Sequence, residues 1–246
     1  MQSTMPKVLI WDLPVRLFHL VFAGGFVAAA VIALVLGDDG PLFPYHGMIG
    51  LTVGVALALR AVWGVIGSRH ARFASFAYGP AAVIRFMAST LRGKGERFAG
   101  HNPGASHTML AMFALMAALV ATGVMLGLGN EGVKEAHEFL SYAMVLAVIA
   151  HLAGLALHTV MHRELIAASM VHGRKQADPS EAIGSAHAVA GVVLALVTAG
   201  FAAALWANFD RATATTRIPL VGTTISLGEV EHAEGEHGGR EDEDDD

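Results

Sequence analysis

Residues 137–151 read HEFLSYAMVLAVIAH, an apolar stretch with a histidine at each end. In an α-helix, the fourteen steps from His137 to His151 span about 21 Å. Fourteen rotations of about 100° return to within about 40° of the start, so both imidazoles leave one face. Two further apolar stretches begin at or near a histidine, His19 and His46. Imidazole inside a bilayer is costly unless it is ligated or hydrogen-bonded, so these four histidines predict two cofactors stacked across a membrane.

The composition of the chain also indicates a membrane protein. Only 15% of its residues are charged, whereas soluble proteins have about 25%. The first of its apolar runs resembles a signal peptide, but it is longer than the apolar part of such a peptide and contains a histidine. We therefore count five runs long enough to cross a hydrocarbon core of about 30 Å, namely Leu17–Leu36, His46–Ile66, His107–Leu128, His137–Val160 and Ser185–Trp206.

The placement of Lys and Arg residues orients the five spans. Cytoplasmic loops of membrane proteins carry an excess of these residues, which favours a cytoplasmic N-terminus and an external C-terminus. The external side then receives Lys134, Arg211, Arg217 and Arg240, and the cytoplasmic side receives Lys7, Arg16, Arg60, Arg69, Arg72, Arg85, Arg92, Lys94, Arg97, Arg163, Arg174 and Lys175. We expect a multi-pass protein of the bacterial inner (cytoplasmic) membrane.

The chain contains no cysteine. This excludes iron–sulfur clusters, covalently attached c-type haem and disulfides, all of which need the thiol. A redox cofactor would therefore be bound non-covalently by histidine. A b-type haem with two axial histidines fits, and such a haem transfers electrons because no axial position is open for substrate.

The depth of each histidine determines the pairs. His46 and His137 both begin spans that enter from the outside, so they predict an outer pair. His19 lies near the inner surface, level with the deeper part of the fourth span, where His151 and His158 are both within reach by geometry. The spans and these pairs predict an all-α integral membrane fold in which two haems are stacked across the bilayer; the family resemblance given below specifies it as a four-helix dihaem bundle with a fifth transmembrane helix.

Other residues near the predicted haems have two interpretations each. Arg16 and Arg60 fit as partners of the inner haem's propionates, and equally as anchors at the inner membrane surface. Glycines at one or two turns from the histidines leave room for a flat ring, or serve close helix packing; they are Gly50, Gly54 and Gly154.

Two segments lie outside the predicted spans. The inner loop contains an amphipathic stretch, Ala81–Leu91, which predicts a helix either at the lipid surface or packed on the bundle. From Glu229 onward the chain has ten acidic residues and one arginine, which predicts a solvated, flexible tail. We divide the chain into a dihaem cytochrome b membrane domain (1–176), an additional transmembrane helix (177–208) and an outer acidic tail (209–246), which we expect to be flexible throughout.

Several motifs resemble the prokaryotic cytochrome b561 family, in particular the branch with the b-type cytochrome subunits of nickel–iron hydrogenases. The motifs occur in order over about residues 8–176 and are IWDLPVRLFH (10–19), LRAVWGVIGS (59–68), RFASF (72–76), GHNPG (100–104) and MVHGRK (170–175). The resemblance implies a four-helix dihaem core that exchanges electrons with quinone and with a redox partner. It places the haem ligands at His19, His46, His137 and His151, and so favours His151 over His158.

The resemblance implies a function in electron transfer. We expect two bis-histidine haems b, quinone as substrate, and contacts with membrane lipid and with a redox partner such as a hydrogenase or c-type cytochrome, but not with nucleic acid. One alternative is a histidine-lined metal or proton transporter, although no Asp or Glu lies deep in any span. Another is a membrane anchor in which the histidines only stabilise the core.

Overall fold

The computed structural model describes residues 5–93 and 97–228. Five of its helices are long and apolar enough to cross a membrane, which confirms the five predicted spans. Four of them begin three or four residues before the predicted run, partly because Asp12 and Asn102 cap helix starts ahead of the apolar residues. The five helices are α1 (Leu13–Val31, continued by the π-helical segment Ile32–Leu36), α2 (Phe43–Ile66), α4 (Pro103–Gly127), α5 (Lys134–His162) and α7 (Ala188–Ala207).

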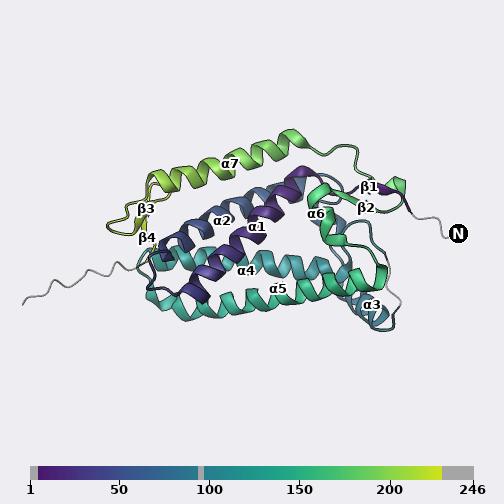
Figure 1. Ribbon diagram of the computed structural model, residues 1–246, viewed down its shortest axis with the longest axis horizontal. Helices are drawn as coiled ribbons and strands as arrows, with labels where there is room; N and C mark the ends of the chain where they lie inside the picture. Colours follow the sequence, from purple (N-terminus) through teal and green to yellow (C-terminus); the bar gives the residue numbers. More distant parts are fainter. Residues whose placement is uncertain (1–4, 94–96, 229–246) are drawn as a thin grey trace, which may run out of the picture.

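The helices form three layers (Figure 1). Helices α1 and α2 lie between α7 on one side and the pair α4 and α5 on the other. Glycines allow close approach at three contacts: Gly25 of α1 faces α2, Gly54 of α2 faces α4, and Gly191 of α7 faces α1. Helix α5 packs mainly along α4, and its Met144 also reaches side chains of α1 and α2.

One end of the bundle, which we call the N-terminal end, carries the start of α1 and the end of α2. Strand β1 (Lys7–Leu9) pairs antiparallel with β2 (Arg174–Gln176) there, and α6 (Ser169–His172) lies beside them. The predicted inner-loop helix is present as α3 (Pro80–Leu91). Its Phe86 packs near Gly104 of α4, while Ile84 and Met87 are exposed.

The opposite end, which we call the hairpin end, is covered by residues that we had assigned to a flexible tail. Strands β3 (Thr215–Arg217) and β4 (Thr224–Ser226) form an antiparallel hairpin. The first half of residues 209–246 is therefore folded, and this corrects the expectation of flexibility for 209–228. The physical reason is burial: Thr216, Ile225 and Leu227 alternate along the strands and face the helix ends. The acidic stretch from Glu229 lies outside the described residues.

Candidate functional site

The clearest candidate site is formed by His46 of α2 and His137 of α5 at the hairpin end. The centres of the two imidazole rings lie 6.2 Å apart, with their planes at 73°. A metal–imidazole bond is about 2 Å long, so two imidazoles on opposite sides of one metal have ring centres roughly 6 Å apart. The observed separation matches that arrangement.

Hydrogen bonds set which nitrogen of each ring remains available. The Nδ1–H of His46 donates to the carbonyl of Ala29 at 2.9 Å. Nδ1 of His137 lies 2.8 Å from Oγ1 of Thr122, whose hydroxyl donates to the carbonyl of Ala118 at 2.8 Å. Because that hydroxyl proton is already used, Oγ1 accepts from Nδ1–H of His137. In neutral rings with these contacts Nε2 carries no proton, which is the form that a metal needs, and the Nδ1 contacts resemble the outer contacts that orient metal-ligating histidines.

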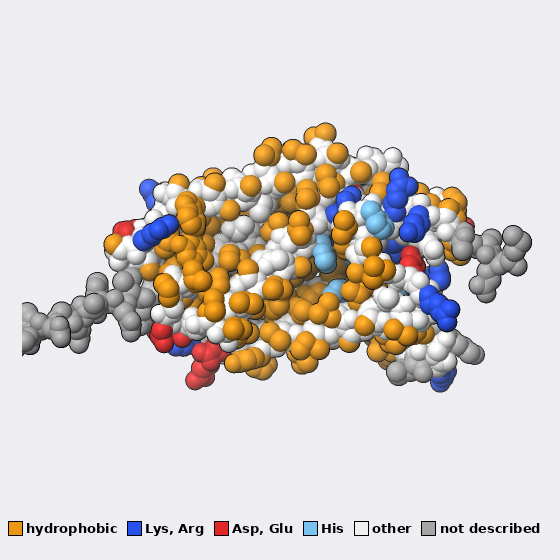
Figure 2. All heavy atoms as spheres, viewed as in Figure 1, with side chains coloured by type: hydrophobic (Ala, Val, Ile, Leu, Met, Phe, Trp, Pro, Cys, Tyr) orange, Lys and Arg blue, Asp and Glu red, His pale blue; other side chains and the backbone are white. Residues whose placement is uncertain are grey.

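The second candidate pair lies nearer the N-terminal end. It consists of His19 of α1, whose side chain is exposed, and His151 of α5, which is half-buried. The ring centre of His158 lies 4.4 Å from that of His162, with the two ring planes tilted by 48°. Figure 2 shows histidine side chains at the surface in this region, surrounded by apolar side chains.

The two arginines proposed beside the inner haem each have a buried donor without a partner among the described residues. Arg60 is buried and donates from Nη2 to the carbonyl of Ala71 at 2.9 Å, whereas its Nη1 is unpaired. Arg16 donates to the carbonyl of Val171 through Nη2, whereas its buried Nε is unpaired. Buried donors usually have acceptors, so these two fit an anionic group that the protein alone does not supply.

The glycines near the histidines divide into two kinds. A Cβ atom added at Gly50 of α2 or Gly154 of α5 would meet nothing within 4 Å, so both face open space. Gly54 instead faces Val120 of α4 and serves helix packing. The helix surface is therefore open one turn from His46 and from His151, which leaves room for a flat ring beside each histidine.

A tightly packed apolar layer separates the two pairs. Met144 lies seven residues from both His137 and His151 and is completely buried. It packs with side chains from the other three core helices, namely Phe18, Phe22, Val53, Ala56, Met112 and Met116. The two pairs are therefore separate sites with a dry core between them.

Residues from several of the motifs given in the sequence analysis contact one another at the N-terminal end. Asp12 has no exposed surface and accepts from the backbone N–H of Val15 at 3.0 Å, from Nε1 of Trp63 at 2.9 Å and from Oγ of Ser68 at 2.5 Å. The preceding residue, Trp11, donates from Nε1 to Oγ of Ser169 at 3.1 Å. This network fixes the start of α1, and hence the depth of His19.

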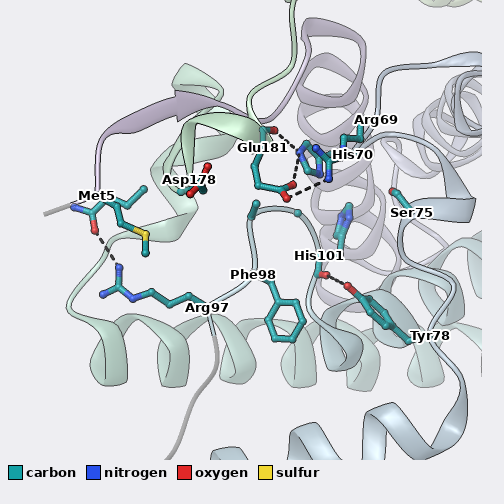
Figure 3. Close-up of a pocket in the computed structure, with 14 residues that line it drawn as sticks. Met5, Arg69, His70, Ser75, Tyr78, Arg97, Phe98, His101, Asp178 and Glu181 are labelled. Atoms are coloured by element: carbon teal, nitrogen blue, oxygen red, sulfur yellow. Dashed lines mark hydrogen bonds and ion pairs between the residues drawn. The ribbon is translucent and has the colours of Figure 1, made fainter. Parts of the chain in front are cut away.

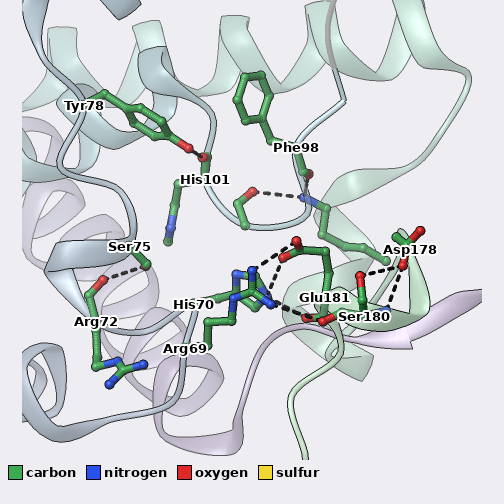
Figure 4. A network of polar contacts seen from close by, with 12 residues as sticks. Arg69, His70, Arg72, Ser75, Tyr78, Phe98, His101, Asp178, Ser180 and Glu181 are labelled. Carbon is green, nitrogen blue, oxygen red and sulfur yellow. Dashed lines mark hydrogen bonds and ion pairs between the residues drawn. The ribbon is translucent and has the colours of Figure 1, made fainter.

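A polar pocket of about 450 Å³ opens beside this network (Figures 3 and 4). Glu181 forms an ion pair with Arg69 at 3.1 Å, and its backbone carbonyl accepts from Nε2 of His70 at 2.8 Å. The His101 ring lies between Trp11 and Phe76, 4.7 Å from each ring centre.

The titration of two groups at this pocket is shifted by their surroundings. Burial, together with the positive charges of Arg60 and Lys175, lowers the pKa of His101 to about 3. Burial also lowers the pKa of Lys175 to about 8, although Glu164 opposes the shift. The Lys175 ammonium donates to the carbonyls of Phe98 and Gly100 at 2.9 and 3.2 Å. His101 is therefore neutral at physiological pH.

The sequence analysis missed three residues that organise these sites. Thr122 is an unremarkable threonine in an apolar span, and only the fold brings it to His137. Asp12 and His101 did carry a signal, since both lie inside quoted motifs, IWDLPVRLFH and GHNPG. We interpreted these motifs as evidence of kinship and did not ask what each polar residue contacts.

Comparisons with a family model and with individual proteins indicate the same kind of protein. A family model described as prokaryotic cytochrome b561 matches residues 10–173, which excludes α7 and the hairpin. A probable Ni/Fe-hydrogenase B-type cytochrome subunit of Rhizobium leguminosarum bv. viciae is 24% identical over 214 residues, 69% of this chain and 89% of that protein. A protein of the same description from Bradyrhizobium diazoefficiens is 23% identical over 216 residues, 70% of this chain and 87% of that protein. No solved structure matches the chain.

Proposed function

Because the chain belongs to the prokaryotic cytochrome b561 family, we propose that it is a dihaem b-type cytochrome that carries electrons across the bilayer between a redox partner and the quinone pool. The family places the chain among multi-pass bacterial membrane proteins that bind haem b and transfer electrons. The finer points of the proposal are two haems, bis-histidine ligation, quinone as substrate, and a hydrogenase as partner.

The pairing of His46 with His137 is the observation that carries the proposal. Two rings 6.2 Å apart, each with Nδ1 engaged and Nε2 free, fit the axial ligands of one haem. His19 and His151 supply the second pair. The unpaired donors of Arg16 and Arg60 support propionate binding at this second site.

The protein's own residues would perform distinct tasks around the bound groups. Each haem supplies an iron that changes between two oxidation states. The four histidines would hold the two haems, which would then supply electron transfer and not substrate binding at iron. Thr122 and the Ala29 carbonyl orient the rings at the hairpin end. The layer around Met144 excludes water between the sites.

The same layer argues against the transporter. A path for ions or protons needs polar or charged groups through the middle of the membrane. Here the middle is filled by Met144, Phe22 and their apolar neighbours, and each is almost completely buried. The only Asp or Glu residues in the five long helices are Glu135 and Glu138, near the start of α5.

The proposed partner follows from the relatives. The similar rhizobial proteins are described as probable Ni/Fe-hydrogenase cytochrome subunits, and we extend this association to the present chain, with a c-type cytochrome as the alternative. We also propose the inner-membrane location, the cytoplasmic N-terminus and the division at residues 176 and 208. The hairpin is then a folded part of the last segment.

Haem counting tests the proposal. The purified full-length protein should contain two haems b per chain, with a reducible b-type visible spectrum. His46→Ala and His137→Ala should each remove the same haem, and His19→Ala and His151→Ala should each remove the other. One haem per chain would eliminate one pair, and a colourless protein would contradict the proposal. Loss of the second haem in His158→Ala but not in His151→Ala would move that ligand to His158.

A membrane assay tests which partner donates electrons to the haems and whether quinone accepts them. In membranes that also contain the hydrogenase, hydrogen should reduce both haems, and an added quinone should reoxidise them. If only a reduced c-type cytochrome reduces the haems, the partner is of that class. If added quinone leaves reduced haems unchanged, quinone is not the substrate.

A further inference from the structure

The C-terminal hairpin packs directly against the end of the bundle that carries His46 and His137. Ile225 and Leu227 have 3% and 6% of their surface exposed, and they share an apolar cluster with Met48 of α2 and Leu205 of α7. One hydrogen bond closes the hairpin, from Leu227 N–H to the Ala214 carbonyl at 2.8 Å. Another ties it to α7, from the Thr216 hydroxyl to the Leu205 carbonyl at 3.0 Å. None of this segment falls within the family match, which ends at residue 173.

Two glycines bring the hairpin close to the helices of the histidine pair. Gly47 follows His46, and a Cβ atom there would lie 2.8 Å from Cδ2 of Leu227. Gly127 lies on α4, one turn beyond the Thr122–Gly123 segment that touches His137, and a Cβ atom there would lie 2.8 Å from the Ser226 carbonyl oxygen. The end of the hairpin therefore bridges α2 and α4 beside the site.

A third contact reaches the His46 ring itself. The ring of Phe43 is parallel to that of His46, with centres 5.5 Å apart. On the hairpin, Gly228 approaches Phe43 closely, since a Cβ at that glycine would lie 3.0 Å from Cδ1 of Phe43. The hairpin therefore contacts Phe43, and Phe43 in turn contacts the ring of His46.

We propose that the hairpin is a clamp for the histidine pair at this end. By bridging α2 and α4 it fixes the position of His46 relative to Thr122 of α4, which holds the His137 ring. By covering the ends of α2 and α4 it keeps water from the site. Leu227 and Phe43 are positioning residues, because they act through His46. The inference rests on the proposed function, since it assumes that the pair holds a haem. A drier surrounding disfavours the more highly charged oxidised iron, so the clamp raises the reduction potential of this haem.

Replacing the Leu227 side chain by the smaller alanine tests the clamp in the full-length, haem-loaded protein. In Leu227→Ala the haem at His46 and His137 should titrate at a lower potential and change its ferric low-spin electron paramagnetic resonance signal. The other haem should keep both its potential and its signal. Leu227→Met, which nearly conserves the volume, should restore native values. The matched control is Leu220→Ala in the turn of the same hairpin, where the side chain is fully exposed.

A second variant displaces the hairpin by adding a side-chain atom where α4 touches the hairpin backbone. Gly127→Ala places a Cβ against the Ser226 carbonyl and should reproduce the selective shift. Gly200→Ala on α7, where a Cβ meets nothing within 4 Å, is its control. If Gly127→Ala does not accumulate in the membrane, Leu227→Ala alone tests the clamp, because that substitution removes atoms and creates no clash.

The outcomes separate the clamp from the function. If the native protein has two haems and Leu227→Ala changes neither of them, or shifts both equally, the clamp is wrong and the proposed function stands. If the native protein has no haem at His46 and His137, both proposals fall.

Discussion

At the scale of single residues, we expect the threonine beside His137 to affect how tightly the haem is retained at this site. Thr122 accepts from Nδ1–H of His137 and so fixes the orientation of that ring. Loss of such an outer contact typically lowers metal affinity about 10–100-fold. We expect Thr122→Val to weaken haem retention at this site by that order, measured as haem b per chain during dilution or competition with apomyoglobin. Thr108→Val on the same helix is the control, since Thr108 contacts only its own helix at Gly104. Equal retention in both variants would contradict the role of Thr122.

The His101 ring predicts a pH dependence of stability. Burial holds its pKa near 3 in the folded protein, below the ordinary value of about 6.5. Between these values the unfolded chain binds a proton that the folded chain does not, so stability falls as pH drops from about 6.5 toward 3. The groups that surround the ring, namely Arg60, Lys175, His70 and His151, are all basic.

Substitution of this histidine tests the prediction. His101→Phe conserves the stacking between Trp11 and Phe76 but cannot titrate, so its melting temperature should fall less between pH 7 and pH 5 than that of the native protein. His107→Phe removes an exposed histidine nearby and should keep the native slope. A native slope in His101→Phe would mean that other groups carry the dependence.

Side-chain roles could be predicted from the sequence only where spacing along one helix was enough. The fourteen-residue spacing of His137 and His151 predicted one face of α5, and the depth argument predicted two pairs, of which the structure brings the rings of His46 and His137 close together. Depth could not choose between His151 and His158, because both lie on that face; in the structure the ring of His158 lies beside that of His162. Hydrogen-bond partners such as Thr122 come from another helix, and no pattern within one segment reports them.

At the scale of elements, the start of α1 depends on one carboxylate. Asp12 caps the helix and also accepts from Trp63 and Ser68. A lost cap costs about 1 kcal/mol, and each buried donor left unpaired costs about 1–3 kcal/mol. We therefore expect Asp12→Ala to destabilise the protein by about 3 kcal/mol or more, with a loosened haem at His19, measured by denaturation and by the visible spectrum. Asp178→Ala removes an exposed cap and should cost about 0.5 kcal/mol or less; a similar loss in both variants would contradict the prediction.

The five long helices were predictable because a membrane imposes length and apolarity on each span. The hairpin was not. Its two strands have three residues each, and their burial depends on contacts with α2, α4 and α7 that are distant in sequence. The acidic run after Glu229 also dominated the interpretation of the segment, although Ile225 and Leu227 precede it.

At the scale of the whole molecule, the distribution of charge defines two unlike ends. Most of the Lys and Arg side chains visible in Figure 2 lie at the N-terminal end, around the pocket and β2. The described part of the hairpin end carries Lys134, Arg211 and Arg217, with Asp38, Asp39, Glu131 and Glu135 to offset them. By the positive-inside rule, this asymmetry predicts that the basic end lies in the cytoplasm.

This asymmetry predicts the orientation of both haem sites. A reporter that is active only outside the cytoplasm should function when fused after Asp246 and should be silent when inserted after Gly93, in the loop at the N-terminal end. The clamped pair, His46 and His137, then faces the external side, and the pair with Arg16 and Arg60 faces the cytoplasm. An activity pattern opposite to this one would exchange the two sites: electrons from an external partner would then arrive first at His19 and His151, and the hairpin would cover the cytoplasmic side.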